Sequence, residues 1–255
     1  MPFELVTIPC LADNYAFLLH DSETNTTALF DAPEEAPILA ALAKRGWALD
    51  LIFITHHHYD HVDGLDGILA EHTARVIGNA ADAARLPPLH QQVNEGDEIP
   101  LGSGTARVIE VSGHTIGHLA FYVEAANAVF TADSLMALGC GRLFEGPADM
   151  MWASLKKLMA LPEDTIVCSG HEYTAANGKF AMTIEPGNPD LVARIAQITK
   201  AREAGVSTVP STLKEELATN PFLRGHIAEV QKSVGLSGAD VGDVFARVRQ
   251  AKDNF

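Results

Sequence analysis

Four histidines and one aspartate are gathered in the stretch Thr55-His56-His57-His58-Tyr59-Asp60-His61. The apolar run Leu49–Thr55 leads into it and predicts a buried strand, so the polar residues emerge at a strand end, where protein sites are usually built. Neutral imidazoles and a carboxylate are good ligands for divalent metal ions. In the spacing H-x-H-x-D-H, a turning loop can direct the first two histidines at one ion and the Asp-His pair at a neighbouring ion. The alternative interpretation is a solvated histidine-rich loop.

Other polar residues also follow predicted strands, which favours a metal site over a solvated loop. Each of them closes an apolar run, so all would emerge at one edge of a sheet. The residues and their strands are His114 after Thr105–Ser112, Asp133 after Ala128–Ala132, and His171 after Thr165–Ser169. This repeated placement predicts one shared site.

The first two thirds of the chain alternate short apolar runs with loops, which is typical of layered α/β proteins. We expect further strands at Phe3–Pro9, Tyr15–His20, Thr26–Asp31, Ala74–Gly78 and Leu119–Glu124, and helices at Glu34–Arg45, Asp66–His72 and Met150–Leu161. After His171 a helical texture takes over, with helices expected at Leu191–Ala204, Ser211–Ala218, Ile227–Val234 and Ala239–Ala251. We therefore predict two domains, residues 1–173 and 174–255.

The composition excludes several classes of protein. The chain has 255 residues, of which 47% are hydrophobic, enough to bury a sizeable core. Its 18 Lys and Arg stand against 33 Asp and Glu, a net charge of -15, which argues against binding to nucleic acid or an anionic membrane. Three scattered cysteines are too few for a disulfide framework, and we find neither a secretory signal nor an apolar run of about 18 residues. We expect a cytoplasmic, monomeric protein.

The order H-x-H-x-D-H, then a histidine, an aspartate and a histidine on strand-end loops, resembles the metallo-β-lactamase superfamily. The resemblance implies an α/β fold, the four-layer αβ/βα sandwich of that superfamily, here followed by a C-terminal helical domain. It also implies two divalent metal ions, for which we expect zinc, although iron and manganese suit the same ligands. The implied ligands are His56, His58 and His114 at the first ion, Asp60, His61 and His171 at the second, and Asp133 as a bridge.

Three polar residues near these ligands have open roles. His57 is surplus to the ligand set, and we expect it to be exposed or to lie behind the ligands. His118 would either orient His114 or simply pack, and packing is the preferred interpretation. Asp31 ends a predicted strand, and we prefer a loop-capping role to a contact with a ligand.

Stretches that span nearly the whole chain resemble glyoxalase II, the hydroxyacylglutathione hydrolase family. They are Ile8–Tyr15, Gly139–Gly146, Gly170–Thr174, Asn220–Arg224 and Arg249–Phe255. The resemblance implies hydrolysis of S-D-lactoylglutathione and other 2-hydroxyacylglutathiones to glutathione and D-lactate, the second step of methylglyoxal detoxification. A metal-bridging hydroxide would attack the thioester, since a strongly polarised zinc water has its pKa lowered from ~15.7 to ~7. Asp60 and Asp133 are the expected catalytic residues, with ligation the preferred role for Asp60.

Five residues are candidates for binding the substrate: Arg142, Phe144, Tyr173, Arg249 and Lys252. The last two are three positions apart, so on a helix they share a face and can clamp one carboxylate. Spacing alone favours solvated cations near a helix end, whereas the resemblance implies that they bind the glycine carboxylate of glutathione. By the same resemblance Tyr173 and Phe144 flank the peptide, although Phe144 lacks the hydroxyl of the tyrosine found in some relatives.

Rival functions stay open at this point. A persulfide dioxygenase-like enzyme would use one iron and oxygen, but all seven ligand positions and the C-terminal helices argue against it. A broad thioesterase or lactonase would differ by lacking the set Arg142, Arg249 and Lys252. A non-catalytic metal-binding module or a nucleic-acid-processing module on the same fold is a further alternative, and the acidic balance argues against nucleic acid. Ser134 and Cys140 are nearby nucleophiles, but neither stands in a G-x-S-x-G elbow or beside a free base, so we interpret both as structural.

Overall fold

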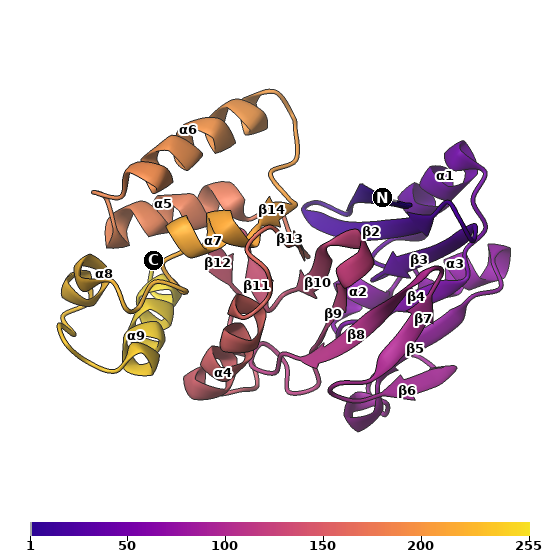
Figure 1. Cartoon of the computed structure of the whole chain (residues 1–255), viewed down its shortest axis with the longest axis horizontal. Coiled ribbons are helices and arrows are strands. Elements are labelled where there is room, and N and C mark those ends of the chain that lie inside the picture. Colours follow the sequence, from indigo (N-terminus) through magenta and orange to yellow (C-terminus); the bar gives the residue numbers. More distant parts are fainter. Residues whose placement is uncertain (1) are drawn as a thin grey trace. The chain divides into compact units, whose positions relative to one another are not determined.

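The computed structural model describes residues 2–255, which form two compact units (Figure 1). The first unit consists of the chain up to Glu110 together with Ile116–Ala132. The second consists of Val111–Thr115 and Asp133–Phe255. Among the described residues, no helix is both long and apolar enough to cross a membrane. The predicted domain boundary between residues 173 and 174 stays a prediction.

The first unit begins with a mixed six-stranded sheet in the order β1-β2-β3-β4-β5-β6. Neighbours are antiparallel from β1 to β3 and parallel from β3 to β6. The strands are β1 (Phe3–Cys10), β2 (Asn14–Asp21), β3 (Thr26–Phe30), β4 (Leu51–Phe53), β5 (Arg75–Asn79) and β6 (Gln91–Val93). The helices between them are α1 (Glu35–Arg45), α2 (Tyr59–Val62), α3 (Leu65–Glu71) and the 3-10 turn η1 (Ala80–Asp82).

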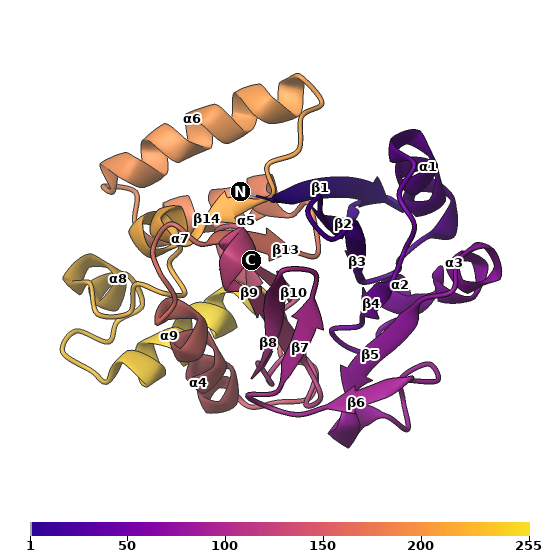
Figure 2. The ribbon, with the colours of Figure 1, turned by 45° about the vertical axis from the view of Figure 1, so that its right-hand side comes forward.

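The two faces of this sheet bury different side chains because successive residues of a strand point to opposite sides. On one face Leu29 and Ile52 join a core with Ile38 of α1 and Ile68 of α3, and Figure 2 shows both helices beside the strands. On the other face Phe30 stacks on Phe53 and Phe130, with ring centroids 4.9 and 3.4 Å apart. The central strands are therefore covered on both sides, which explains their continuous apolar sequence.

The second face packs against an antiparallel group of strands that completes the first unit. These are β7 (Glu98–Leu101), β8 (Gly104–Glu110), β9 (Leu119–Val123), η2 (Glu124–Ala126, a 3-10 turn) and β10 (Ala128–Ala132). Phe121 of β9 lies 4.8 Å from Phe53 between ring centroids. This packing places the end of β4 and the loop after it at the border of an aromatic core, so the histidine stretch starts from a rigid base.

The second unit is mainly helical. Its elements are β11 (Leu135–Met136), β12 (Gly139–Cys140), α4 (Ala148–Met159), β13 (Ile166–Ser169), α5 (Thr174–Ile184), α6 (Pro189–Glu203), β14 (Ser211–Thr212), α7 (Leu213–Thr219), α8 (Ala228–Ser233) and α9 (Val241–Asp253). The four expected C-terminal helices are confirmed, whereas α5 was missing from the prediction. Local signals set their starts: Asn188 caps α6 ahead of Pro189, and Thr212 forms a capping box with Glu215 at α7.

The short hairpin of β11 and β12 is held by side chains from the helical segments. Asn220 donates its amide to the carbonyls of Met136 and Gly139 at 3.2 and 2.9 Å. The buried carboxylate of Glu216 accepts the main-chain N–H of Leu138 at 2.8 Å, where the backbone is left-handed with φ of 55°. A bulky residue is strained in that conformation, so these hydrogen bonds stabilise the turn.

Candidate metal centre

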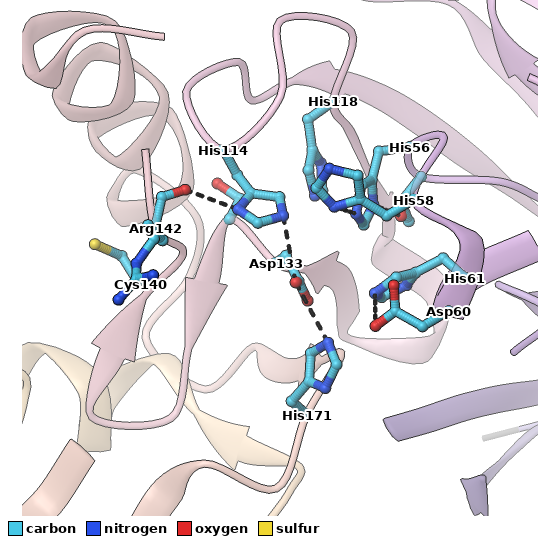
Figure 3. Close-up of polar contacts among 12 residues, drawn as sticks. His56, His58, Asp60, His61, His114, His118, Asp133, Cys140, Arg142 and His171 are labelled. Atoms are coloured by element: carbon cyan, nitrogen blue, oxygen red, sulfur yellow. Dashed lines mark hydrogen bonds and ion pairs between the residues drawn. The ribbon is translucent and has the colours of Figure 1, made fainter. Parts of the chain in front are cut away.

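The candidate ligands of the first unit begin in the loop after β4. His56 is completely buried, and its Nδ1 lies 2.9 Å from the hydroxyl oxygen of Thr55. Its Nε2 lies 3.1 Å from Nδ1 of His58 (Figure 3). Two bonds of 2.0–2.1 Å from nitrogen to zinc add up to about 4.2 Å, so one ion can reach both atoms. The spacing of the two rings therefore fits a shared metal ion.

Asp60 and His61 follow on α2. The Nε2 of His61 lies 3.9 Å from Oδ2 of Asp60, again within the reach of one ion. The Nδ1 of His61 lies 2.8 Å from Oδ2 of Asp31, so that nitrogen carries the proton and Nε2 presents its lone pair. Atoms of Asp31, His56 and His61 lie within 4.8 Å of one another. The chemistry of these donors fits a divalent ion.

Asp31 has the expected capping role and a further contact. Its carboxylate does cap the loop, because it accepts the main-chain N–H and the hydroxyl of Thr55, both at 2.9 Å. The same carboxylate also holds His61. The preferred capping role is therefore confirmed. Asp31 contacts His61 in addition, since the end of β3 lies beside the end of β4 in the parallel part of the sheet.

The candidate ligands of the second unit form a chain of three buried residues. The Oδ2 of Asp133 lies 3.4 Å from Nε2 of His114 and 3.3 Å from Nε2 of His171 (Figure 3). The Nδ1 of His114 lies 2.8 Å from the carbonyl of Arg142. A carbonyl only accepts, so Nδ1 carries the proton and Nε2 is left as a donor to metal. The Nε2 atoms of both histidines thus face Oδ2 of Asp133, and Nε2 is the atom that would bind an ion.

The two surplus histidines pack behind the ligands of the first unit. His57 lies with Nδ1 3.1 Å from Oδ2 of Asp82, which also pairs with Arg85. His118 is completely buried and stacks on His56, with centroids 4.5 Å apart and planes 15° apart. His118 therefore packs against His56, in line with the preferred packing role, and the alternative role toward His114 stays open.

Three of the five candidate substrate residues lie close to ligands of the second unit. Phe144 is 61% exposed and its ring meets His114 edge-on, with centroids 5.2 Å apart. Tyr173 stacks on His171, with centroids 4.6 Å apart and planes 5° apart. The exposed Arg142 lies 3.8 Å from Asp253 through its Nε. Their roles in binding substrate stay predictions.

The other two candidates lie on α9 in different surroundings. Arg249 is 5% exposed and donates to the carbonyl of Cys140 and to Asp253, both at 2.9 Å. Lys252 lies over the rings of Phe180 and Phe255, with Nζ 5.3 and 5.2 Å from the centroids. Burial, followed by the charge of Arg249, lowers the pKa of Lys252. Arg249 is therefore already engaged with the protein, whereas Lys252 is the more accessible cation.

The cysteines are buried and unsuited to nucleophilic attack. Burial raises the pKa of Cys140 to about 11 and that of Cys10 to about 12. Burial also raises the pKa of Cys168 well above its ordinary value. A thiol needs its thiolate form to act as a nucleophile, so these observations agree with a structural role for Cys140.

Two functional candidates escaped the sequence analysis. Asn14 contacts Asp60, and Asp253 links Arg142 and Arg249. Both stand inside stretches that resemble glyoxalase II, Ile8–Tyr15 and Arg249–Phe255, and that was the available signal. An asparagine or an aspartate alone does not indicate such a role, because the role depends on which residue it contacts in the folded protein.

Comparison with known proteins agrees with this architecture. Residues 18–171 match the family model described as Metallo-beta-lactamase superfamily, and residues 172–255 match the one described as Hydroxyacylglutathione hydrolase C-terminus. The crystal structure of the BLEG-1 B3 metallo-beta-lactamase has a TM-score of 0.67 at 20% identity, covering 86% of this chain and 99% of that one. ETHE1 from Myxococcus xanthus also has a TM-score of 0.67, at 24% identity, covering 98% and 90%. These structures confirm the predicted metallo-β-lactamase-like fold.

Relatives with much higher sequence identity define the family. A hydroxyacylglutathione hydrolase of Ruegeria pomeroyi is 56% identical over 255 residues, covering 100% of both chains. That of a Jannaschia species is 59% identical over 252 residues, covering 99% of this chain and 98% of the relative. The similarity includes both the histidine stretch and the helical C-terminal part. The chain therefore belongs to the hydroxyacylglutathione hydrolase family of the metallo-β-lactamase superfamily.

Proposed function

We propose that this protein hydrolyses the thioester of S-D-lactoylglutathione and of other 2-hydroxyacylglutathiones. Water adds across the bond between the acyl carbon and sulfur, which yields a 2-hydroxy acid such as D-lactate and the free thiol of glutathione. The observation that carries the proposal is identity of 56–59% along essentially the whole chain to hydroxyacylglutathione hydrolases. The buried histidine and aspartate groups supply the chemistry that such a reaction needs.

The proposal includes two divalent metal ions, with zinc as the expected metal. Its support is the match to the superfamily pattern and the ring orientations within each unit, where Arg142 and Asp31 fix the protons of His114 and His61. The proposed ligands are His56, His58 and His114 for the first ion, Asp60, His61 and His171 for the second, and Asp133 between them. When bound, the ions would provide a water of lowered pKa and polarise the thioester carbonyl.

The residues of the chain would hold the ligands and the substrate in place. Asp133 would keep the facing nitrogens of His114 and His171 at a common centre, in line with its 3.4 and 3.3 Å contacts. Phe144 and Tyr173 would lie along the glutathione peptide. Lys252, with Arg142 and Arg249, would offset the repulsion between a dicarboxylate substrate and a chain of net charge -15.

A direct assay tests this proposal. The protein as purified is analysed for bound metal by mass spectrometry and is then mixed with S-D-lactoylglutathione and a thiol reagent. We expect two ions per chain and release of one thiol per substrate. Absence of thiol release from protein that holds two ions would contradict the proposal. Oxygen consumption with glutathione persulfide by a protein that holds one iron would instead support the dioxygenase-like alternative.

The proposal also covers the state of the protein in the cell, as a monomeric cytoplasmic enzyme. Sedimentation of the purified protein measures its mass, and fractionation of cells followed by the thiol-release assay measures its location. A dimer in solution, or activity confined to the membrane fraction, would contradict this part.

A further inference from the structure

We propose that Asn14 is a positioning residue that directs one carboxylate oxygen of Asp60 toward the second metal ion. The inference goes beyond the ligand pattern, which gives Asn14 no role, and it rests on the proposed function in taking Asp60 as a ligand. It is carried by contacts that all lie within the first unit.

Asn14 stands on a rigid element. It is the first residue of β2 and pairs in register with Cys10 of β1, directly across the turn that joins the two strands. Its side chain is almost completely buried, with the residue 4% exposed. The sheet therefore fixes both the origin and the direction of the Asn14 amide.

Asp60 stands on an element that cannot position it alone. It lies in α2, a helix of four residues whose N-cap residue makes no side-chain capping hydrogen bond. So short a helix has little intrinsic stability. The Asp60 side chain is also 21% exposed, so packing restrains it less than it restrains the buried His61. An outside contact is needed to select one orientation of its carboxylate.

Asn14 makes that contact with two atoms of Asp60. Its Nδ2 donates to the main-chain carbonyl of Asp60 at 3.0 Å and to the carboxylate oxygen Oδ2 at 3.1 Å. The first bond holds the first turn of α2, and the second holds the side chain. A carboxylate oxygen has a second lone pair, so a hydrogen bond from Asn14 still allows Oδ2 to bind metal.

The held oxygen is the one that faces the neighbouring ligand. Oδ2 of Asp60 lies 3.9 Å from Nε2 of His61, and bonds of 2.0–2.2 Å from each atom to an ion add up to about 4.2 Å. His61 is oriented by Asp31 through its other nitrogen. Each of the two adjacent candidate ligands is thus oriented by a hydrogen bond with a different residue. Asp31 orients His61, and Asn14 orients Asp60.

The test replaces Asn14 by leucine, which has a similar branched shape and no polar group. Metal is counted by mass spectrometry during titration of the purified holoenzyme with a chelator. Since loss of a hydrogen bond to a ligand weakens metal binding about 10- to 100-fold, we expect Asn14→Leu to release one of two ions at 10- to 100-fold lower chelator strength. With cobalt as the probe, the visible absorption of that one site should also change.

Asn188 offers a matched control. Its Nδ2 donates to a main-chain carbonyl, that of Ala218 at 2.9 Å, and to a carboxylate, that of Glu185 at 3.1 Å. It is buried and contacts no predicted ligand through these bonds. Asn188→Leu should therefore lower the melting temperature while both ions stay bound as in the unchanged protein. Equal loss of metal in the two variants would overturn the inference.

Further outcomes separate this inference from the proposed function. If the unchanged protein hydrolyses S-D-lactoylglutathione and Asn14→Leu holds both ions as tightly, the Asn14 role is overturned while the function stands. If the unchanged protein does not release thiol but Asn14→Leu still loses one ion selectively, the function fails and the Asn14 role stands. Asn14→Ala, which avoids any misfit of leucine, should give the same selective loss.

Discussion

The Oδ2 atom of Asp31 lies 2.8 Å from Nδ1 of His61, although the two residues come from different elements. Asp31 follows β3, and its backbone is left-handed with φ of 59°, a conformation that aspartate and asparagine tolerate better than most residues. The turn of the backbone aims the carboxylate at both Thr55 and His61. One residue thereby fixes the start of the histidine loop and the orientation of a candidate ligand.

Replacement of Asp31 should therefore weaken metal binding more than folding. Asp31→Asn keeps the size and the tolerance of left-handed φ but removes the negative charge beside His61. We expect affinity for one of the two ions to fall about 10- to 100-fold, measured by titration with a chelator. Asp50→Asn is the control, because Asp50 caps the N–H of Thr27 in the same sheet. Equal affinities in the two variants would refute the role.

We expect the buried ion pair of Arg194 and Glu216 to contribute to the stability of the fold. Glu216 is completely buried and pairs with Arg194, so Arg194→Leu leaves a carboxylate without its counter-charge. We expect the free energy of unfolding to fall by about 3–5 kcal/mol, measured by urea denaturation. Combining Arg194→Leu with Glu216→Gln should recover most of the loss. Arg202→Leu, which breaks a more exposed pair with Glu172, should cost less than about 1 kcal/mol. Equal losses in both single variants would contradict the prediction.

Because the pKa of Asp21 is lowered in the folded protein, we expect the protein to lose stability in acid. Burial opposes ionisation of Asp21, but hydrogen bonds outweigh burial, chiefly from the N–H groups of Ser103 and Glu23, and lower its pKa to about 2 from 3.8. A carboxyl with a lowered folded pKa stabilises the protein above its unfolded pKa, and the contribution disappears as pH falls from about 4 toward 2. Melting temperatures across this window should fall less steeply for Asp21→Asn. Identical slopes would disprove the assignment.

Lys252 predicts how substrate charge affects binding. Lys252→Met should raise KM about tenfold for S-D-lactoylglutathione, the loss expected from about 1.4 kcal/mol of charge-assisted bonding. KM for a small uncharged thioester should stay unchanged. Because burial and Arg249 lower the pKa of Lys252, KM for the charged substrate should also rise with pH before an ordinary lysine would lose its charge. Lys232→Met on α8 is the control. A similar rise for both substrates would contradict a carboxylate-binding role.

The sequence predicted those helices and strands whose own residues form a recognisable pattern of apolar and polar positions. His56, Asp133 and His171 could be proposed as candidate ligands because polar residues directly after apolar runs mark strand ends. Helix α5 was missed because Gly178 interrupts its pattern and resembles a stop. A Cβ at Gly178 would collide with Cδ1 of Ile195, so the glycine allows close approach to α6. The reason for a glycine inside this helix becomes visible only when α5 and α6 are packed together.

The contacts of Asn14 and Arg249 could not be predicted for a related reason. Asn14 precedes Asp60 by 46 positions, and Arg249 follows Cys140 by 109. An isolated asparagine or arginine is compatible with any surface, turn or core role, and its partner depends on which loops the sheet brings together. Candidate metal ligands can thus be proposed from their spacing, whereas the contacts around them need a folded structure.

The hairpin of β11 and β12 shows that the two family segments are not interchangeable parts. The segment that matches the general superfamily encodes the hairpin, but Asn220, Glu216 and Arg249 satisfy its main-chain groups from the segment that is specific to this family. A chain cut after residue 171 would leave those carbonyls and N–H groups without these side-chain partners. Grafting the superfamily segment onto a foreign C-terminal segment should therefore also require transplanting these three side chains.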